Sequence, residues 1–135
     1  MRAEGSFTYT ANNSSTFAVA QANFFANSNT SWDSSTVLLQ TWHFGSPIYW
    51  SQAPECTQII YKFVFTSPIL DDAGQETNEY KVMLTKRDWV TTNHVTVYDL
   101  AVYEKAPDYF KVRIEIEVSS LNYHIRDHGF DFVVF

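Results

Sequence analysis

The chain has 135 residues, a net charge of −6 and a hydrophobic content of 45%. This length fits one domain, and the hydrophobic content excludes a chain that is disordered throughout. The nine basic residues are scattered except for Lys86 and Arg87, so no basic stripe follows a nucleic-acid backbone. The single cysteine, Cys56, excludes an internal disulfide, and no apolar run approaches membrane-spanning length.

The start of the chain is polar and nearly uncharged. Of the first 36 residues, 17 are Ser, Thr or Asn and three are charged. We expect residues 1–15 to form a flexible polar linker that begins with vector-derived residues. Residues 16–135 are expected to form the domain. Residues 16–35 would be its partly ordered lead-in, because Phe24 and Phe25 are unusual in a free linker.

Three Asn-x-Ser/Thr patterns, the acceptor pattern for N-glycosylation, occur in this region. They begin at Asn12, Asn13 and Asn29. A stretch this rich in Asn and Ser also produces such patterns by composition alone. Glycosylation would require passage through the secretory pathway, so both interpretations remain open.

From residue 36 onward, short apolar runs alternate with turn residues. The clearest run is 111–118, where Val112 and Ile114 begin an unbroken alternation of apolar and charged side chains that predicts a half-buried strand. Further strands are predicted at residues 37–44, 58–66, 80–85, 95–103, 121–125 and 130–135, with short ones at 48–50 and 89–91. All four prolines lie between these runs, as a sheet requires. The pattern predicts an all-β, antiparallel β-sandwich or jelly-roll-like single domain.

Aromatic residues make up 17% of the chain and supply most of its candidate core and contact residues. We assign four of them to the core: Phe63, Phe65, Phe110 and Phe132. Tyr49, Trp50 and Trp89 lie near predicted turns. There they would form a contact surface for self-association or a receptor, because Trp and Tyr dominate interface hot spots. The alternative for these residues is burial in the core.

The segment at residues 71–79 is acidic and contains one glycine. Asp71, Asp72 and Glu76 are candidate calcium ligands, because calcium prefers carboxylate and amide oxygens. The segment lacks the alternating spacing of an EF-hand. An exposed, solvated hairpin loop is the alternative.

His124 and His128 belong to the densest group of ionisable residues. Both are candidates for an interface that responds to pH. The segment reads as a turn at residues 127–129, so it does not supply the helical geometry with which an i, i+4 histidine pair binds zinc. Structural hydrogen bonding is the alternative.

Catalytic signatures are absent from the sequence. It has no Gly-x-Ser-x-Gly pattern for a nucleophile, and four glycines are too few for a phosphate-binding loop. We therefore expect a protein that binds partners and is not an enzyme.

Three segments resemble the protruding domain of nodavirus capsid proteins of shrimp and prawn. They are Thr-Trp-His-Phe-Gly-Ser-Pro-Ile-Tyr-Trp at 41–50, Ala-Pro-Glu-Cys at 53–56 and Tyr-His-Ile-Arg-Asp-His-Gly-Phe-Asp-Phe at 123–132. The resemblance covers residues 30–135. It rests on general appearance, because such domains have no short defining motif.

The resemblance implies a domain on the capsid surface of a virion that folds apart from the shell. It would form a homodimer during capsid assembly and attach to a host receptor or glycan. The composition and charge pattern lead us to expect no nucleic-acid binding through this domain, no membrane insertion and no cofactor other than the candidate calcium ion. A carbohydrate-binding or adhesin-type β-sandwich module is the alternative.

Overall fold

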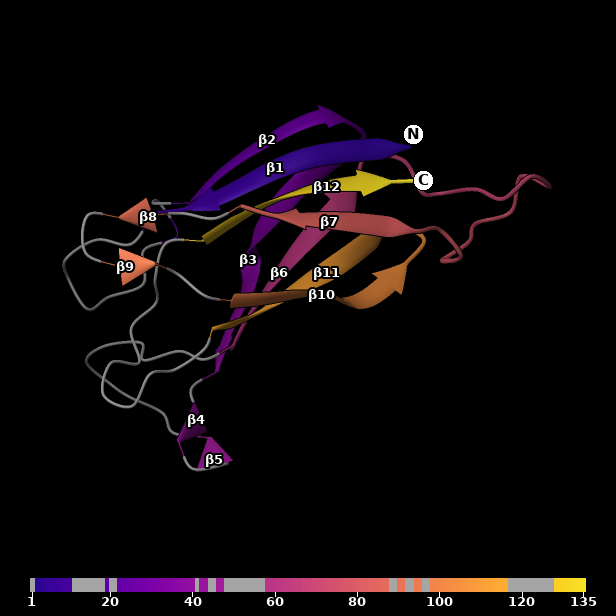
Figure 1. The fold of residues 1–135 in the computed structure, drawn as a ribbon. Coiled ribbons are helices and arrows are strands. Elements are labelled where there is room, and N and C mark those ends of the chain that lie inside the picture. Colours follow the sequence, from indigo (N-terminus) through magenta and orange to yellow (C-terminus); the bar gives the residue numbers. More distant parts are fainter. Residues whose placement is uncertain are drawn as a thin grey trace.

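The computed structural model describes residues 2–10, 19, 22–40, 42–43, 46–47, 58–87, 90–91, 94–95, 98–116 and 128–135. These residues form an all-β sandwich of two four-stranded antiparallel sheets (Figure 1). Sheet A has the order β2-β1-β12-β7 and consists of β1 (Ala3–Tyr9), β2 (Ala22–Ser28), β7 (Val82–Lys86) and β12 (His128–Val134). Sheet B has the order β10-β11-β6-β3 and consists of β3 (Thr30–Gln40), β6 (Gln58–Phe65), β10 (Tyr98–Ala106) and β11 (Tyr109–Ile116).

Two short ribbons accompany the sandwich. One pairs β4 (Trp42–His43) with β5 (Ser46–Pro47), and the other pairs β8 (Val90–Thr91) with β9 (His94–Val95). In the part of the chain that is described, no helix has the length and apolar character needed to cross a membrane.

The all-β prediction is confirmed, and so are most of the predicted strands. Strand β6 matches the predicted run at residues 58–66, and β12 contains most of the run at 130–135. Strand β3 begins at Thr30, earlier than the predicted run at 37–44. The predicted strands at 48–50 and 121–125 lie outside the described residues.

The first strand corrects the prediction for residues 1–15. Ala3–Tyr9 is not a linker: it is a central strand of sheet A, with β12 on one side and β2 on the other. Its side chains alternate between buried and half-buried along its whole length, and Phe7 and Tyr9 are 0% and 1% exposed. The small polar residues that suggested a linker occupy the outer face of this strand.

Gly5 shows how closely β1 fits the core. A Cβ atom at this position would lie 2.5 Å from Cζ of Phe132 and 2.9 Å from Cε2 of Phe24, both closer than van der Waals contact. The two rings are nearly parallel, with centroids 6.1 Å apart. Only a glycine leaves room for both rings beneath the strand.

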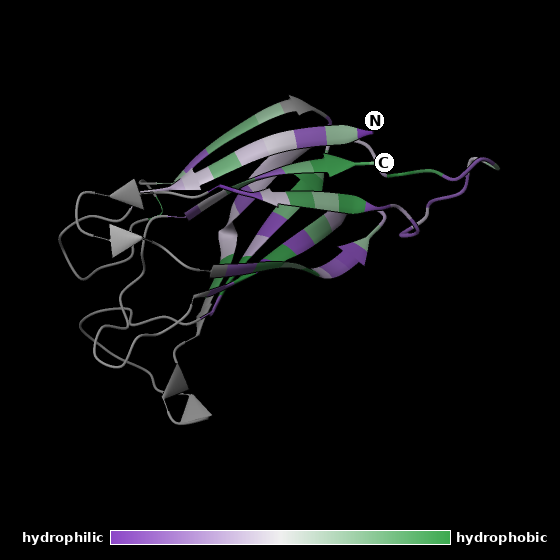
Figure 2. Ribbon diagram, viewed as in Figure 1, coloured by the Kyte–Doolittle hydropathy of each residue, from purple (hydrophilic) through white to green (hydrophobic). Residues whose placement is uncertain are grey.

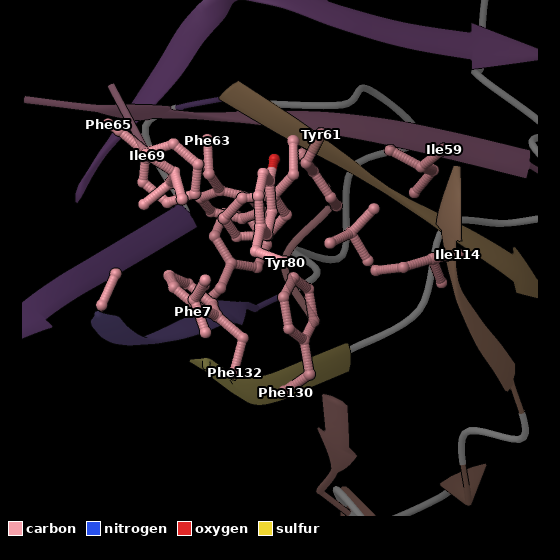
Figure 3. Close-up of a cluster of buried hydrophobic side chains, with 14 of the residues drawn as sticks. Phe7, Ile59, Tyr61, Phe63, Phe65, Ile69, Tyr80, Ile114, Phe130 and Phe132 are labelled. Carbon is pink, nitrogen blue, oxygen red and sulfur yellow. The ribbon is translucent and has the colours of Figure 1, made fainter. Parts of the chain in front are cut away.

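The core lies between the two sheets and is dominated by aromatic rings (Figure 3). Phe63 of β6 lies at its centre, with ring centroids 5.3 Å from Phe110, 5.2 Å from Phe132 and 5.9 Å from Phe7. Bands of hydrophobic and hydrophilic residues alternate along the strands of both sheets (Figure 2). The four phenylalanines that the sequence assigned to the core are all buried, with Phe65 the most exposed at 4%.

A corner at Asn29 joins β2 of sheet A to β3 of sheet B. Asn29 has a φ of 47°, a left-handed conformation that asparagine tolerates better than most residues. Its Oδ1 accepts hydrogen bonds from the Thr66 hydroxyl and from the Ser67 amide. Asn29, the first residue of the third glycosylation pattern, therefore uses its side chain for hydrogen bonds that stabilise this corner.

The connection between β6 and β7, residues 66–81, is hydrogen-bonded to the β10–β11 hairpin. The Ile69 amide donates to the Pro107 carbonyl at 2.8 Å. The Tyr80 hydroxyl lies 2.8 Å from the carbonyl oxygen of Ala106 and 2.7 Å from that of Tyr109. Burial raises the pKa of the Tyr80 hydroxyl well above its ordinary value, so it remains a neutral donor.

Replacing Tyr80 by phenylalanine is expected to destabilise the fold by about 0.5–1.5 kcal/mol, the usual net value of one intramolecular hydrogen bond. The ring would keep its contact with Phe65, whose centroid lies 5.3 Å away. Urea denaturation measures the difference. Tyr103→Phe is the matched control, because that side chain is 53% exposed, and equal losses in the two variants would contradict the role of the Tyr80 hydroxyl.

Candidate functional site

The strand ends divide the sandwich into two different ends (Figure 1). At one end the chain termini lie side by side, and the Arg2 amide donates to the Val134 carbonyl at 2.7 Å. At the other end, the strand ends of each sheet are paired with one another. In sheet A, Tyr9 lies opposite Ala22 and His128, and Lys86 lies opposite Phe130. In sheet B, Gln58 lies opposite Gln40 and Glu115, and Tyr98 lies opposite Ile116. We call the second end the loop end.

Four connections begin and end at the loop end: residues 10–21, 41–57, 87–97 and 117–127. The ribbons β4–β5 and β8–β9 belong to two of these connections and lie beyond this end of the sheets (Figure 1). An antiparallel sandwich thus gathers four long connections on one side, as binding domains built on such scaffolds commonly do.

Four of the contact residues proposed from the sequence lie outside the described residues: Tyr49, Trp50, Trp89 and His124. Each belongs to one of three connections that start and finish at the loop end. The fold therefore brings together the strand ends from which these connections leave. Their role in binding stays a prediction.

His128 lies in the core and not on a surface. It is 0% exposed at the start of β12, and its Nε2 atom lies 2.7 Å from the Tyr61 hydroxyl. Its ring stacks on Tyr9 with centroids 5.0 Å apart and planes at 18°. The prediction that His128 contacts a partner is therefore wrong, and the structural hydrogen bond that was its alternative is observed.

The acidic segment forms a tight turn closed by Asp71. Oδ1 of Asp71 accepts hydrogen bonds from the amides of Ala73 and Gln75, both at 2.9 Å. Gly74, with a φ of 80°, completes the turn by donating its amide to the Asp71 carbonyl. Asp71, Asp72 and Glu76 are exposed, and no set of three or more His, Cys, Asp or Glu side chains within the described ranges is placed to hold a metal ion.

Calcium binding at this turn stays a prediction with a direct test. If Asp71 and Asp72 bind calcium, the wild-type chain should melt at a higher temperature in millimolar calcium than in EDTA, because a ligand of the folded state stabilises it. The variant with both residues changed to Asn should lose that difference. Equal melting temperatures of the wild-type chain in both conditions would contradict the calcium site.

A polar cluster on the outer face of sheet A was not anticipated from the sequence. Arg87 donates to both carboxylate oxygens of Asp131, to the Ser6 hydroxyl and to the Thr8 hydroxyl. Ser6 also donates to Asp131 at 2.8 Å. The cluster joins residues of β1 and β12 to Arg87, which directly follows β7. The Lys86-Arg87 pair was its only sequence signal, since the partners lie 44 and 81 residues away from Arg87.

The cluster should make stability depend on pH. Burial opposes ionisation of Asp131, but hydrogen bonds from Arg87 and Ser6 outweigh burial, and the pKa of Asp131 is lowered from its ordinary value. The ionised carboxylate therefore stabilises the fold above about pH 4, and this contribution is lost as the pH falls through the lowered pKa.

Asp131→Asn should cost about 0.2–1 kcal/mol between pH 5 and 7, the range for exposed ion pairs, because both side chains are more than one-third exposed. The difference from the wild-type chain should shrink below pH 4. Urea denaturation at several pH values measures it. A difference that stays constant down to pH 2.5 would contradict the ionic contribution of Asp131.

A second polar cluster lies on the outer face of sheet B, around Tyr109. The Lys62 ammonium lies 4.4 Å from the centroid of the Tyr109 ring, and Lys111 forms an ion pair with Glu104 at 3.0 Å. The Tyr109 hydroxyl donates to the same Glu104 carboxylate at 3.2 Å. The hydrogen bond from Lys111 lowers the pKa of Glu104. Glu104 is therefore held by Lys111 and Tyr109 within the chain.

Comparison with protein-family models, with curated proteins and with solved structures found no match for this chain. The most distinctive feature of the described residues is the difference between the two ends of the sandwich. In the described residues, the two polar clusters join neighbouring strands through internal hydrogen bonds and ion pairs. An arrangement of this kind stabilises a surface, whereas the loop end gathers four connections.

Proposed function

We propose that this chain is a surface domain of a viral capsid that pairs with copies of itself and attaches to a host cell. The observation that supports the proposal is the separation of the two ends. The termini lie side by side at one end, and four long connections begin and end at the other. A domain attached to a shell through the terminal end would hold the loop end away from the shell.

Two further features agree with this role. The net charge of −6 provides an anionic surface that resists non-specific association. The aromatic residues Tyr49, Trp50 and Trp89 belong to connections of the loop end, where they would supply contact area for a receptor or a glycan.

A binding experiment tests attachment through the loop end. The labelled chain is applied to cultured cells and to a glycan array, beside a variant in which Tyr49, Trp50 and Trp89 are changed to Ser. Attachment to cells should fall in the variant while the melting temperature stays within a few degrees. The control is Tyr103→Ser, an exposed aromatic residue of strand β10.

Self-association and glycan binding separate the capsid role from the alternative, a carbohydrate-binding or adhesin-type module. Self-association at micromolar or lower concentration with weak glycan binding supports the capsid role. Tight binding to one glycan by a chain that stays monomeric contradicts the capsid role and supports the alternative.

A further inference from the structure

The sandwich has four edge strands, and three of them carry features that discourage pairing with another chain. The pairing of strand β3 with β6 is interrupted between Asp33 and Leu38, where the register shifts. Strand β10 has a bulge between Val102 and Glu104. Strand β7 has five residues and ends with Lys86 followed by Arg87. Bulges, short length and charge are the means by which soluble proteins protect their sheet edges.

Strand β2, the fourth edge, has little of this protection. Its seven residues include no charged side chain and no proline. From Ala22 to Ala26 it stays in unbroken register with β1, and its one irregularity lies beyond Ala26. Among the described strands, β1 is its only partner in sheet A, so its other edge faces outward at the border of the sheet (Figure 1).

The outer face of β2 carries Phe25, which is 72% exposed. This is the largest exposed fraction of any large apolar side chain among the described residues. An exposed phenylalanine on an uncharged edge strand is a typical feature of a strand that pairs with a partner.

We propose that β2 pairs with β2 of a second copy of this chain, and that the two copies of sheet A join into one continuous antiparallel sheet. The regular segment Ala-Asn-Phe-Phe-Ala at residues 22–26 is suited to pair with itself. A two-fold axis at Phe24 would set Ala22 opposite Ala26, Asn23 opposite Phe25, and Phe24 opposite its own copy.

This register keeps both faces of the sheet consistent. Phe24 is half-buried and its ring lies 5.4 Å from that of Phe63, so it belongs to the core face, whereas Phe25 belongs to the outer face. Paired residues of an antiparallel sheet share a face, and the pairs 22–26, 23–25 and 24–24 all satisfy that condition. No like charges oppose each other, because the segment has none. An interface with two-fold symmetry requires a segment that is complementary to itself, whereas pairing with a strand of another protein does not.

The inference rests on the self-pairing part of the proposed function and gives it a location. Sedimentation velocity over a concentration series measures self-association of the wild-type chain, of Phe25→Lys and of Met83→Lys. Met83 is the matched control, because it is 59% exposed and lies on the outer face of β7, the opposite edge of sheet A. Both side chains are exposed, so neither variant should unfold the domain.

We expect the wild-type chain to dimerise, Phe25→Lys to raise the dissociation constant about tenfold or more, and Met83→Lys to leave it within about twofold. Hydrogen exchange of the amides at residues 23–26 should also slow with increasing concentration of the wild-type chain. If the wild-type chain dimerises but Phe25→Lys leaves the dimer intact, or if both variants weaken it equally, pairing through β2 is overturned. Self-association of the chain would then occur through another surface. A wild-type chain that stays monomeric would overturn both pairing through β2 and self-pairing of the chain. If that monomer bound a strand of another protein at β2, the partner of β2 would be that protein and not a second copy.

Discussion

Deleting residues 1–9 is expected to abolish cooperative folding of this chain. Strand β1 is hydrogen-bonded on both sides, to β12 along its whole length and to β2 from Glu4 to Tyr9. Its loss would separate β2 from sheet A and would remove Phe7, which contacts the rings of Tyr61 and Phe63 in the opposite sheet. Far-UV circular dichroism during heating should then show no sharp transition.

The matched control for this deletion removes only Met1 and Arg2, which precede β1. That variant loses the bond from the Arg2 amide to Val134 and keeps the strand, so it should melt within a few degrees of the intact chain. Cooperative melting of the longer deletion at nearly the wild-type temperature would show that β1 is dispensable.

Changing Phe63 to Ala is expected to cost about 3–5 kcal/mol, the range for removing a large aromatic side chain from a core. Phe63 is 0% exposed, and its ring lies within 6 Å of those of Phe24, Phe110 and Phe130. The cavity would lie between the two sheets, where rings held by strands on both sides cannot close it.

Val64→Ala is the control for that variant. Val64 follows Phe63 on the same strand but is only partly buried, so the change should cost less than about 1.5 kcal/mol. Urea denaturation of the two variants measures both losses. Comparable losses would contradict a core centred on Phe63.

The alternation of apolar and polar residues along the strands predicted the fold class correctly. The prediction of a linker at residues 1–15 failed because small residues at the inward positions of β1 obscured this alternation. In β11 the charged outer residues made the pattern unmistakable. In β1 the two inward positions before Phe7 are Ala3 and Gly5, which carry almost no hydrophobic signal. Gly5 is small because the ring of Phe132 occupies the space beneath it, and that ring comes from the far end of the sequence.

The candidate site was harder to predict because its contacts are long-range. His128 stands beside Gly129 in what reads as an exposed turn, yet its partner is the Tyr61 hydroxyl, 67 residues away. Asp131 reads as the polar member of an alternating strand, which is correct, but its pairing with Arg87 depends on β7 lying next to β12. Periodicity predicts which face a residue occupies and does not predict its neighbour across the sheet.

The pairing of β1 with β12 has a consequence for the order in which the sandwich can form. Ser6 and Asp131 stand 125 residues apart, and β1 leaves the ribosome long before β12. All four strands of sheet B come from the stretch between Thr30 and Ile116, so that sheet can assemble first. Until β12 emerges, β1 can pair only with β2, and sheet A lacks the strand that joins β1 to β7. Sheet A is therefore completed late, and the edge of β1 that β12 later covers is open to aggregation during synthesis.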